Sequence, residues 1–215
     1  MKIIGVILIF LGLALIIYPP LQDFYVRNHQ KQLINTYIQS RDEFEGDPEE
    51  YLREVMENLP SEDTESELGV TDPQEQDSTQ KIIKDTNIIG IIEIPEIKVH
   101  LPIFYDANDS NLAKGAAMVK GTAFPWEDGN TAIAAHKGRQ YGSFFNRLNE
   151  VKDGDLVKLH FLNEEYHYEV YESFVVWPDE VWVLEEVDEK AVVTLVVCIS
   201  DGKKRLIVRG KLTSP

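Results

Sequence analysis

A cysteine, a histidine and an arginine each stand at one end of a predicted strand. Cys198 ends the apolar run TLVVC, His136 follows the short apolar run TAIAA, and Arg205 begins the run RLIV after a turn at Asp201-Gly202. A cysteine thiolate attacks an amide carbonyl. A histidine can protonate the leaving amine and deprotonate the entering one, and a guanidinium offers the oxyanion a permanent positive donor. Together these residue types fit acyl transfer through a thioester.

Residue type and spacing alone leave structural explanations open: an inert core thiol, a surface histidine and a surface ion pair. The runs that contain Cys198 and Arg205 are consecutive and joined by a short connection. We therefore expect them to pair antiparallel, with both side chains facing one site. Arg209 competes for the cationic role, because it lies four residues farther on and faces the same side of a strand.

The other histidines give no sign of a metal site, because their spacing matches no metal-ligand pattern; they are His29, His100, His160 and His167. No EF-hand loop pattern is present among the acidic residues either. We therefore predict no metal site and no cofactor.

Predicted strands dominate the part of the chain that must position these residues. Over residues 97–104, apolar residues alternate with others, which is the period of two of a half-buried strand. Similar runs cover residues 87–94, 131–135, 156–161, 166–176, 191–200 and 205–212, whereas residues 143–151 have a helical pattern. Seven or eight strands with few helices predict an all-β domain over residues 86–215, a closed or nearly closed barrel.

The chain begins with an uncharged apolar run, IIGVILIFLGLALIIY, over residues 3–18. As a helix this run measures about 24 Å at ~1.5 Å per residue, and Pro19, Pro20 and Leu21 extend it toward the ~30 Å of a bilayer core. It ends in Tyr-Pro-Pro and not in a small-x-small cleavage site, which favours a retained anchor over a cleaved signal peptide. We predict a single-pass membrane anchor over residues 1–21, with the rest of the chain extracytoplasmic.

Residues 22–85 form a connector of different composition. Between Arg41 and Asp77 there are 15 acidic residues and two basic ones, which is most of the chain's formal net charge of −16. We expect a short amphipathic helix from Tyr25 to Ile38, followed by an acidic segment that is partly helical or disordered. Two interpretations remain for the acidic segment: a solvated spacer, or a flap over the active site. The negative charge argues against nucleic acid as a partner.

Several of these segments resemble the sortase family. TLVVC followed by RLIVRG resembles the family's paired signature strands, AIAAHKG matches its strand-histidine element, and GIIEIPEIKVHLPIF resembles its opening strands. The resemblance spans roughly Asn87 to Leu212, with the pieces in the family's order. It implies an eight-stranded sortase-type β-barrel with one or two short helices, preceded by an N-terminal membrane helix.

The resemblance also implies an activity, a cysteine transpeptidase that attaches surface proteins to the cell wall. Such an enzyme cleaves an LPxTG-like sorting motif through a Cys thioester and transfers the acyl group to an amine. Carried over by position, Cys198 is the nucleophile, His136 the acid/base and Arg205 the cation. Further positions that resemble groove-lining residues of the family are Thr194, Val196 and Ala134. The implied partners are sorting-signal peptides of secreted proteins and an amine acceptor, such as a cell-wall precursor or a pilin lysine.

The sequence leaves other functions open. AHKG and RLIVRG resemble the pilin-polymerising branch, whose members often carry an Asp-Pro-aromatic lid, but here Gln74 follows Asp72-Pro73. A non-catalytic, membrane-tethered binding module would keep the barrel without the activity, and a plain cysteine endopeptidase would release hydrolysed peptide only. Some relatives bind calcium, which this sequence does not indicate.

Overall fold

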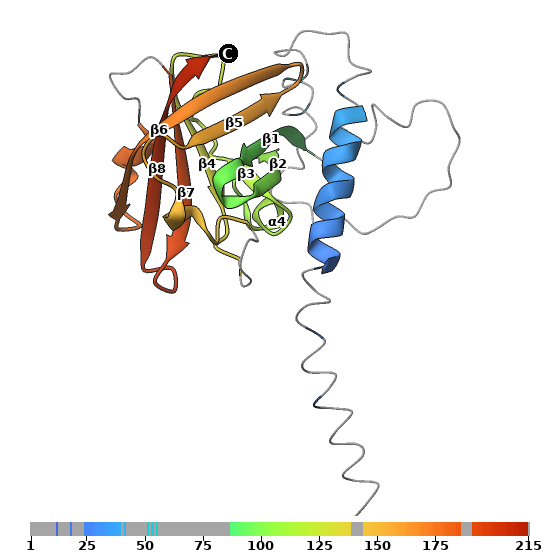
Figure 1. Ribbon diagram of the computed structural model, residues 1–215, viewed down its shortest axis with the longest axis horizontal. Coiled ribbons are helices and arrows are strands. Elements are labelled where there is room, and N and C mark those ends of the chain that lie inside the picture. The colour runs from blue at the N-terminus through green and yellow to red at the C-terminus, as the bar shows by residue number, and fades with distance from the viewer. Residues whose placement is uncertain are drawn as a thin grey trace, which may run out of the picture.

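The structure is a computed structural model that describes residues 24–39, 87–138, 144–185 and 191–214, together with positions 12, 18, 41, 51, 53 and 55. Its main feature is a closed barrel of eight strands in the order β1-β2-β3-β4-β7-β8-β6-β5 (Figure 1). This confirms the predicted eight-stranded barrel. The strands are β1 (Ile88–Ile94), β2 (Val99–Tyr105), β3 (Ala116–Met118), β4 (Gly129–Ala135), β5 (Leu156–Phe161), β6 (Glu164–Val176), β7 (Ala191–Ile199) and β8 (Lys204–Ser214).

The helical elements of the barrel domain are short and lie in its connections. They are the α-helix α4 (Asp109–Leu112) and the 3-10 helices η1 (Pro95–Ile97), η2 (Leu148–Glu150) and η3 (Val181–Leu184). Asn108 caps α4, because its side-chain oxygen accepts from the backbone N–H of Asn111.

Two pairs of neighbouring strands in the barrel are parallel, β2 with β3 and β4 with β7, and all the other pairs are antiparallel. The parallel pairing brings the C-terminal ends of β4 and β7 to the same rim. Because β8 follows β7 through a tight turn, it starts at that rim too. The three elements that carry His136, Cys198 and Arg205 are thus neighbours.

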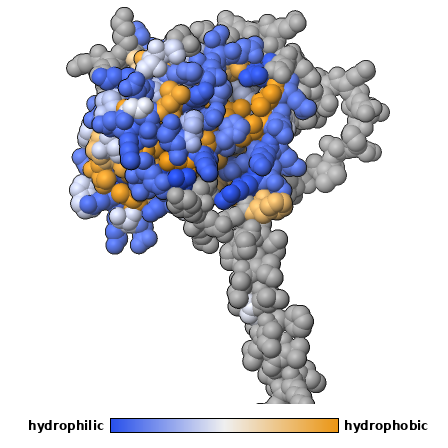
Figure 2. Space-filling model, in the orientation of Figure 1, coloured by the Kyte–Doolittle hydropathy of each residue, from blue (hydrophilic) through white to orange (hydrophobic). Residues whose placement is uncertain are grey.

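The barrel interior is filled by the inward side chains of the strands, in keeping with the period-two pattern. Along β7, Val193, Leu195 and Val197 are buried in this core. Each buried aliphatic side chain of this size contributes about 1.5–3 kcal/mol to folding. The face seen in Figure 2 is largely hydrophilic, with hydrophobic side chains reaching the surface in bands.

A helix over residues 24–39 packs against the outside of the barrel beside α4 and β1 and is blue in Figure 1. This is the short helix predicted from Tyr25 to Ile38. Ile34 and Tyr37 are buried against Ile88, Ile91 and Phe104. The helix is therefore part of the folded domain.

Two tyrosines from the N-terminal segment complete the hydrogen bonding of β1 at a bulge. Ile88 pairs with Phe104 but Gly90 pairs with Ile103, so Ile89 is an extra residue in β1. The Tyr37 hydroxyl donates to the Ile89 carbonyl (3.1 Å) and accepts from the Leu162 backbone N–H (2.7 Å). The Tyr51 hydroxyl donates to the Ile88 carbonyl (2.7 Å). Burial raises the pKa of Tyr37 far above its usual value, because it disfavours the phenolate.

One local prediction is wrong, and one strand was not predicted. The helix expected over residues 143–151 is a turn followed by the single 3-10 turn η2. Its apolar spacing reflects the burial of Phe145 and Leu148, while Phe144 has a positive φ of 48°, which a right-handed helix does not allow. The three-residue strand β3 was not predicted, because its length carries no measurable periodicity.

The predicted anchor over residues 1–21 lies outside the described residues except for Gly12 and Tyr18. Within the described positions, no helix combines the length and the hydropathy that crossing a bilayer requires. Most of the acidic segment also lies outside them.

We predict that Tyr37→Phe lowers the free energy of unfolding by about 1–3 kcal/mol, because it leaves the buried Leu162 N–H and Ile89 carbonyl without this partner. Urea unfolding monitored by circular dichroism would measure the change. Tyr25→Phe is the matched control, since Tyr25 lies on the same helix and is 71% exposed. Equal stability of the two variants would contradict the role assigned to the Tyr37 hydroxyl.

Candidate active site

The parallel register of β4 and β7 places His136 and Cys198 side by side. Ala134 aligns with Val196, and Ala135 aligns with Val197. Ala135 and Val197 point into the core, so the alternation along each strand turns the next residue outward. His136 and Cys198 are those next residues, and both therefore lie on the outer face of the barrel in one row.

The pairing of β7 with β8 adds Arg205 to this row. Cys198 and Arg205 are direct partners across the antiparallel pair, and such partners share a face with Cβ atoms about 4.5–5.5 Å apart. A loop over residues 200–203 joins the strands, with positive φ at Ser200 (52°), Asp201 (54°) and Gly202 (82°), and the Gly202 N–H donates to the Ile199 carbonyl (3.1 Å). The predicted antiparallel pairing is confirmed.

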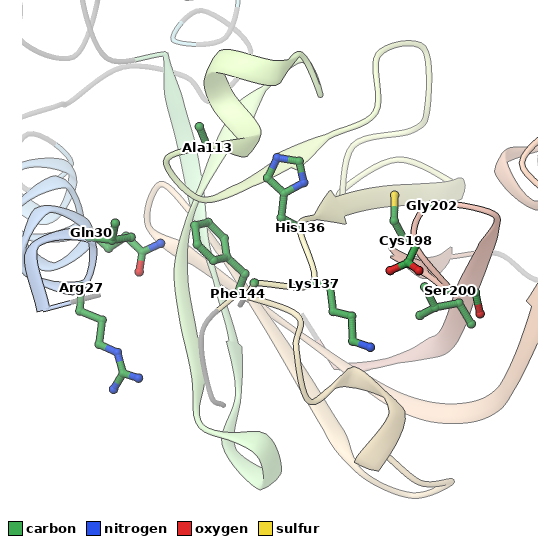
Figure 3. A pocket seen from close by; sticks show the side chains of 13 residues that line it. Arg27, Gln30, Ala113, His136, Lys137, Phe144, Cys198, Ser200 and Gly202 are labelled. Carbon is green, nitrogen blue, oxygen red and sulfur yellow. The ribbon is translucent and has the colours of Figure 1, made fainter. Parts of the chain in front are cut away.

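A cavity of about 790 Å³ opens at His136 and Cys198 of this row. Figure 3 shows the His136 ring and the Cys198 thiol rising from the ends of neighbouring strands, with Phe144, Gln30 and Arg27 across from the thiol. The described residues that line the cavity are Val26, Arg27, Gln30, Ala113, His136, Lys137, Gly138, Phe144, Cys198, Ile199, Ser200, Asp201 and Gly202. The helix over residues 24–39 thus supplies one wall of the cavity that contains the thiol.

His136 is exposed to the cavity and supported from one side. The Phe144 ring meets the imidazole edge to face, with 6.4 Å between ring centroids and an interplanar angle of 67°. The Phe145 backbone N–H donates to the His136 carbonyl (3.0 Å), which closes the loop directly after the histidine. The imidazole is therefore held beside a half-buried Cys198 while its other side stays open to a substrate.

The two candidate arginines lie in different environments. Arg205 is half-buried at the rim, and its Nη1 donates to the Gly202 carbonyl (2.9 Å), which ties the guanidinium to the turn beside Cys198. Arg209 is 6% exposed, two rows away from the thiol, and bonded to Glu172 and to the Val183 carbonyl. Arg205 fits the predicted cationic role better than Arg209, because it lies beside the thiol and is only half-buried.

The predicted groove residues occupy the rows next to the thiol. Ala134 and Val196 are aligned and half-buried in the first row below His136 and Cys198, together with Ile207 and Phe174. Thr194 belongs to the next row and is completely buried, so it lies beneath the surface that a peptide would touch. Phe174 is half-buried and was missed, although counting the register from Arg205 would have found it, whereas Ile207 is completely buried like Thr194. No local sequence pattern indicated that Val26, Arg27 and Gln30 of the helix line the cavity.

Within the described ranges, no group of three or more His, Cys, Asp or Glu side chains is arranged to hold a metal ion.

A thiol, an imidazole and a guanidinium in one row on the outside of a closed barrel are the groups that thiol-dependent acyl transfer requires. Residues 92–213 match the family model of the sortase domain. The chain therefore belongs to the sortase family of cysteine transpeptidases.

The similar proteins include sortases of several types, namely sortase A, sortase D5 and sortase C. The chain is 35% identical to sortase A of Bacillus anthracis over 127 residues, which are 58% of this chain and 60% of that protein. A sortase D5 transpeptidase of Clostridium perfringens superposes with a TM-score of 0.54 and 34% identity, over 59% of this chain and 79% of that one. Sortase C of Clostridium perfringens SM101 superposes with a TM-score of 0.62 and 28% identity, over 86% of this chain and 99% of that one.

We predict that iodoacetamide modifies Cys198 in the folded chain, because the thiol is half-buried and borders the cavity. Mass spectrometry of the native chain should show one adduct. The matched control is the double variant Cys198→Ala, Val197→Cys, which moves the thiol to the inner face, where Val197 is 1% exposed. The control should react only after unfolding. Equal labelling rates in the native state would show that Cys198 is a buried, inert thiol.

Proposed function

We propose that this chain is a membrane-anchored cysteine transpeptidase that joins secreted surface proteins to the cell wall at an LPxTG-like sorting motif. The observation that carries the proposal is the single outer row of His136, Cys198 and Arg205, of which His136 and Cys198 line a cavity of about 790 Å³. The family assignment supports the same chemistry.

In the first half of the reaction, the Cys198 thiolate attacks the carbonyl carbon of the scissile amide. Arg205 lies directly across from Cys198, where its guanidinium can donate to the oxyanion of the tetrahedral intermediate. His136 gives a proton to the leaving amine. The C–N bond breaks, the C-terminal fragment departs, and the N-terminal fragment remains as a thioester on Cys198.

In the second half, an acceptor amine attacks the thioester carbonyl while His136 takes up its proton. The C–S bond breaks, the Cys198 thiolate is regenerated, and a new amide forms. One amide is broken and one is made, so the reaction requires no external energy source. The exposed side of His136 faces the cavity, which leaves room for the acceptor next to the imidazole.

Membrane anchoring by residues 1–21 fits the sequence and the positions that follow it. The apolar run over residues 3–18 is followed by exposed aromatic residues, Tyr18 (63%), Phe24 (63%) and Tyr25 (71%). Aromatic side chains of this kind are favoured at the membrane–water interface. An anchored, extracytoplasmic barrel would meet both partners of the reaction at the cell surface: sorting-signal peptides still held in the membrane, and an amine acceptor in the wall.

The pilin-polymerising alternative uses the same first half-reaction and differs in the acceptor, which would be a lysine of a pilin. Sortase A, sortase C and sortase D5 proteins all resemble this chain, so these likenesses do not choose between acceptors.

The test uses the full chain in mild detergent with an LPxTG-type peptide and either triglycine or a lysine-containing pilin peptide. We expect an amide-linked product by mass spectrometry and none from Cys198→Ala. Arg205→Met should lower kcat/KM by about 10²–10³-fold, the usual loss for one oxyanion donor. Arg205→Lys should recover only part of this, because an ammonium does not reproduce the guanidinium fork.

The other outcomes separate the alternatives. Hydrolysed peptide without any amine-dependent product would identify an endopeptidase. Absence of both products across a library of sorting motifs, from chain shown to be folded, would support a binding module in place of the transpeptidase.

A further inference from the structure

Arg209 is an almost fully buried arginine outside the catalytic row. It lies on β8 opposite Thr194 of β7 and Glu172 of β6, two rows from Cys198. Arginine is almost never buried unless it is paired. Its contacts therefore show which groups compensate the burial of the guanidinium.

The contacts of Arg209 are directed at the connection between β6 and β7. Nη2 donates to the backbone carbonyl of Val183 in η3 (3.2 Å), and Nη1 pairs with Glu172 of β6 (3.3 Å). The guanidinium carbon lies 5.5 Å from the ring centroids of both Phe174 and Trp182. These two rings are themselves stacked, with centroids 5.7 Å apart. Arg209 thus joins a strand of the barrel to the connection that crosses it.

Asn130 holds the same connection from the other side. Its Nδ2 donates to the carbonyls of Val183 (3.0 Å) and Glu185 (3.2 Å). Asn130 lies on β4, the strand that ends before His136, whereas Arg209 lies on β8, the strand that carries Arg205. The Val183 carbonyl therefore receives hydrogen bonds from both sides of the outer face.

Apolar packing holds only part of η3. Val183 is buried against Val176 and Ile207, and Leu184 is partly buried against the same cluster, whereas Val181 is 61% exposed and Trp182 is 46% exposed. The buried hydrogen bonds to its backbone therefore carry a large share of the fixation. Hydrogen bonds that involve a charged group contribute more than neutral ones.

The position of η3 determines where a peptide groove can begin. In the row directly beside the thiol, Ala134 and Val196 are half-buried, whereas Ile207 is completely buried and packs with Val183 of η3. The connection therefore covers the β8 side of this row and leaves Ala134 and Val196 partly accessible. A shift of η3 would change this wall without moving the catalytic row.

We propose that Arg209 is a positioning residue that fixes the β6–β7 connection through the Val183 carbonyl and so shapes the wall of the sorting-peptide groove. This inference rests on the proposed transpeptidase function only for the identity of the ligand in the groove. The fixation itself concerns this chain alone.

Hydrogen–deuterium exchange tests the fixation without substrate. In Arg209→Met, the amides of residues 177–185 should exchange about tenfold faster than in the wild type, the effect of losing roughly one charge-assisted hydrogen bond. Arg147→Met is the matched control, because Arg147 also joins a glutamate, Glu150, to a backbone carbonyl, that of Ile97, but does so away from the groove. Exchange in residues 177–185 should not change in the control.

Steady-state kinetics then test the consequence. In Arg209→Met, KM for the sorting peptide should rise about tenfold while kcat stays within about twofold, because the chemistry at Cys198 is unchanged. Iodoacetamide labelling of Cys198 should keep its wild-type rate. The KM of Arg209→Lys should lie between those of the wild type and Arg209→Met, because one ammonium cannot replace both polar contacts and the packing on the rings. If Arg209→Met does not fold, Asn130→Ala removes the second donor to Val183 and should give the same pattern.

The outcomes are distinct from those of the proposed function. Wild-type chain that forms no product refutes the transpeptidase, whatever the exchange data show. Unchanged exchange over residues 177–185 in both Arg209→Met and Asn130→Ala overturns the positioning role. A fall in kcat as large as the fall in kcat/KM would also overturn the positioning role.

Discussion

The candidate site depends on the hydrogen-bonded register between the parallel strands β4 and β7. That register aligns Ala135 with Val197, and the following residues, His136 and Cys198, emerge together on the outer face. Because side chains alternate with a period of two, a slip of one residue would turn one of them into the core. The buried partners Ile133 and Leu195 oppose such a slip, since it would expose them to water. The hydrophobic core therefore stabilises the geometry of polar groups on the opposite face of the same strands.

The N-terminal segment is part of this arrangement at the positions that the structure describes. Tyr37 and Tyr51 bond the carbonyls of Ile89 and Ile88 around the bulge in β1, and Val26, Arg27 and Gln30 line the cavity of the thiol. The superposition on a sortase C covers 86% of this chain, more than the barrel alone. A fragment limited to residues 86–215 would lose these contacts, so experiments on the activity should keep the helix over residues 24–39.

Two arginines of one strand, on one face, differ because of what surrounds them. Arg205 stands at the rim, where its guanidinium is tied to a turn carbonyl and lies across from the thiol. Arg209 lies beneath the β6–β7 connection, where a carboxylate, a carbonyl and two rings surround it. A guanidinium in water can reorient toward a developing charge, whereas a buried one stays with its partners because leaving them unpaired is costly. In the mechanism proposed above, chemistry and positioning are thereby divided between two identical side chains.

The sequence by itself determined the local features: strands with a period of two, the turn at Asp201-Gly202 between the strands of Cys198 and Arg205, and the shared face of these two side chains. It also indicated the family and a helix near Tyr25 to Ile38. Only the tertiary structure decided that β4 lies parallel to β7, that the helix forms a wall of the cavity, that η3 packs on Ile207, and that residues 144–150 are not an α-helix. These features arise from contacts between segments far apart in the chain. Local periodicity reports which face of a segment is buried, but not which distant segment buries it.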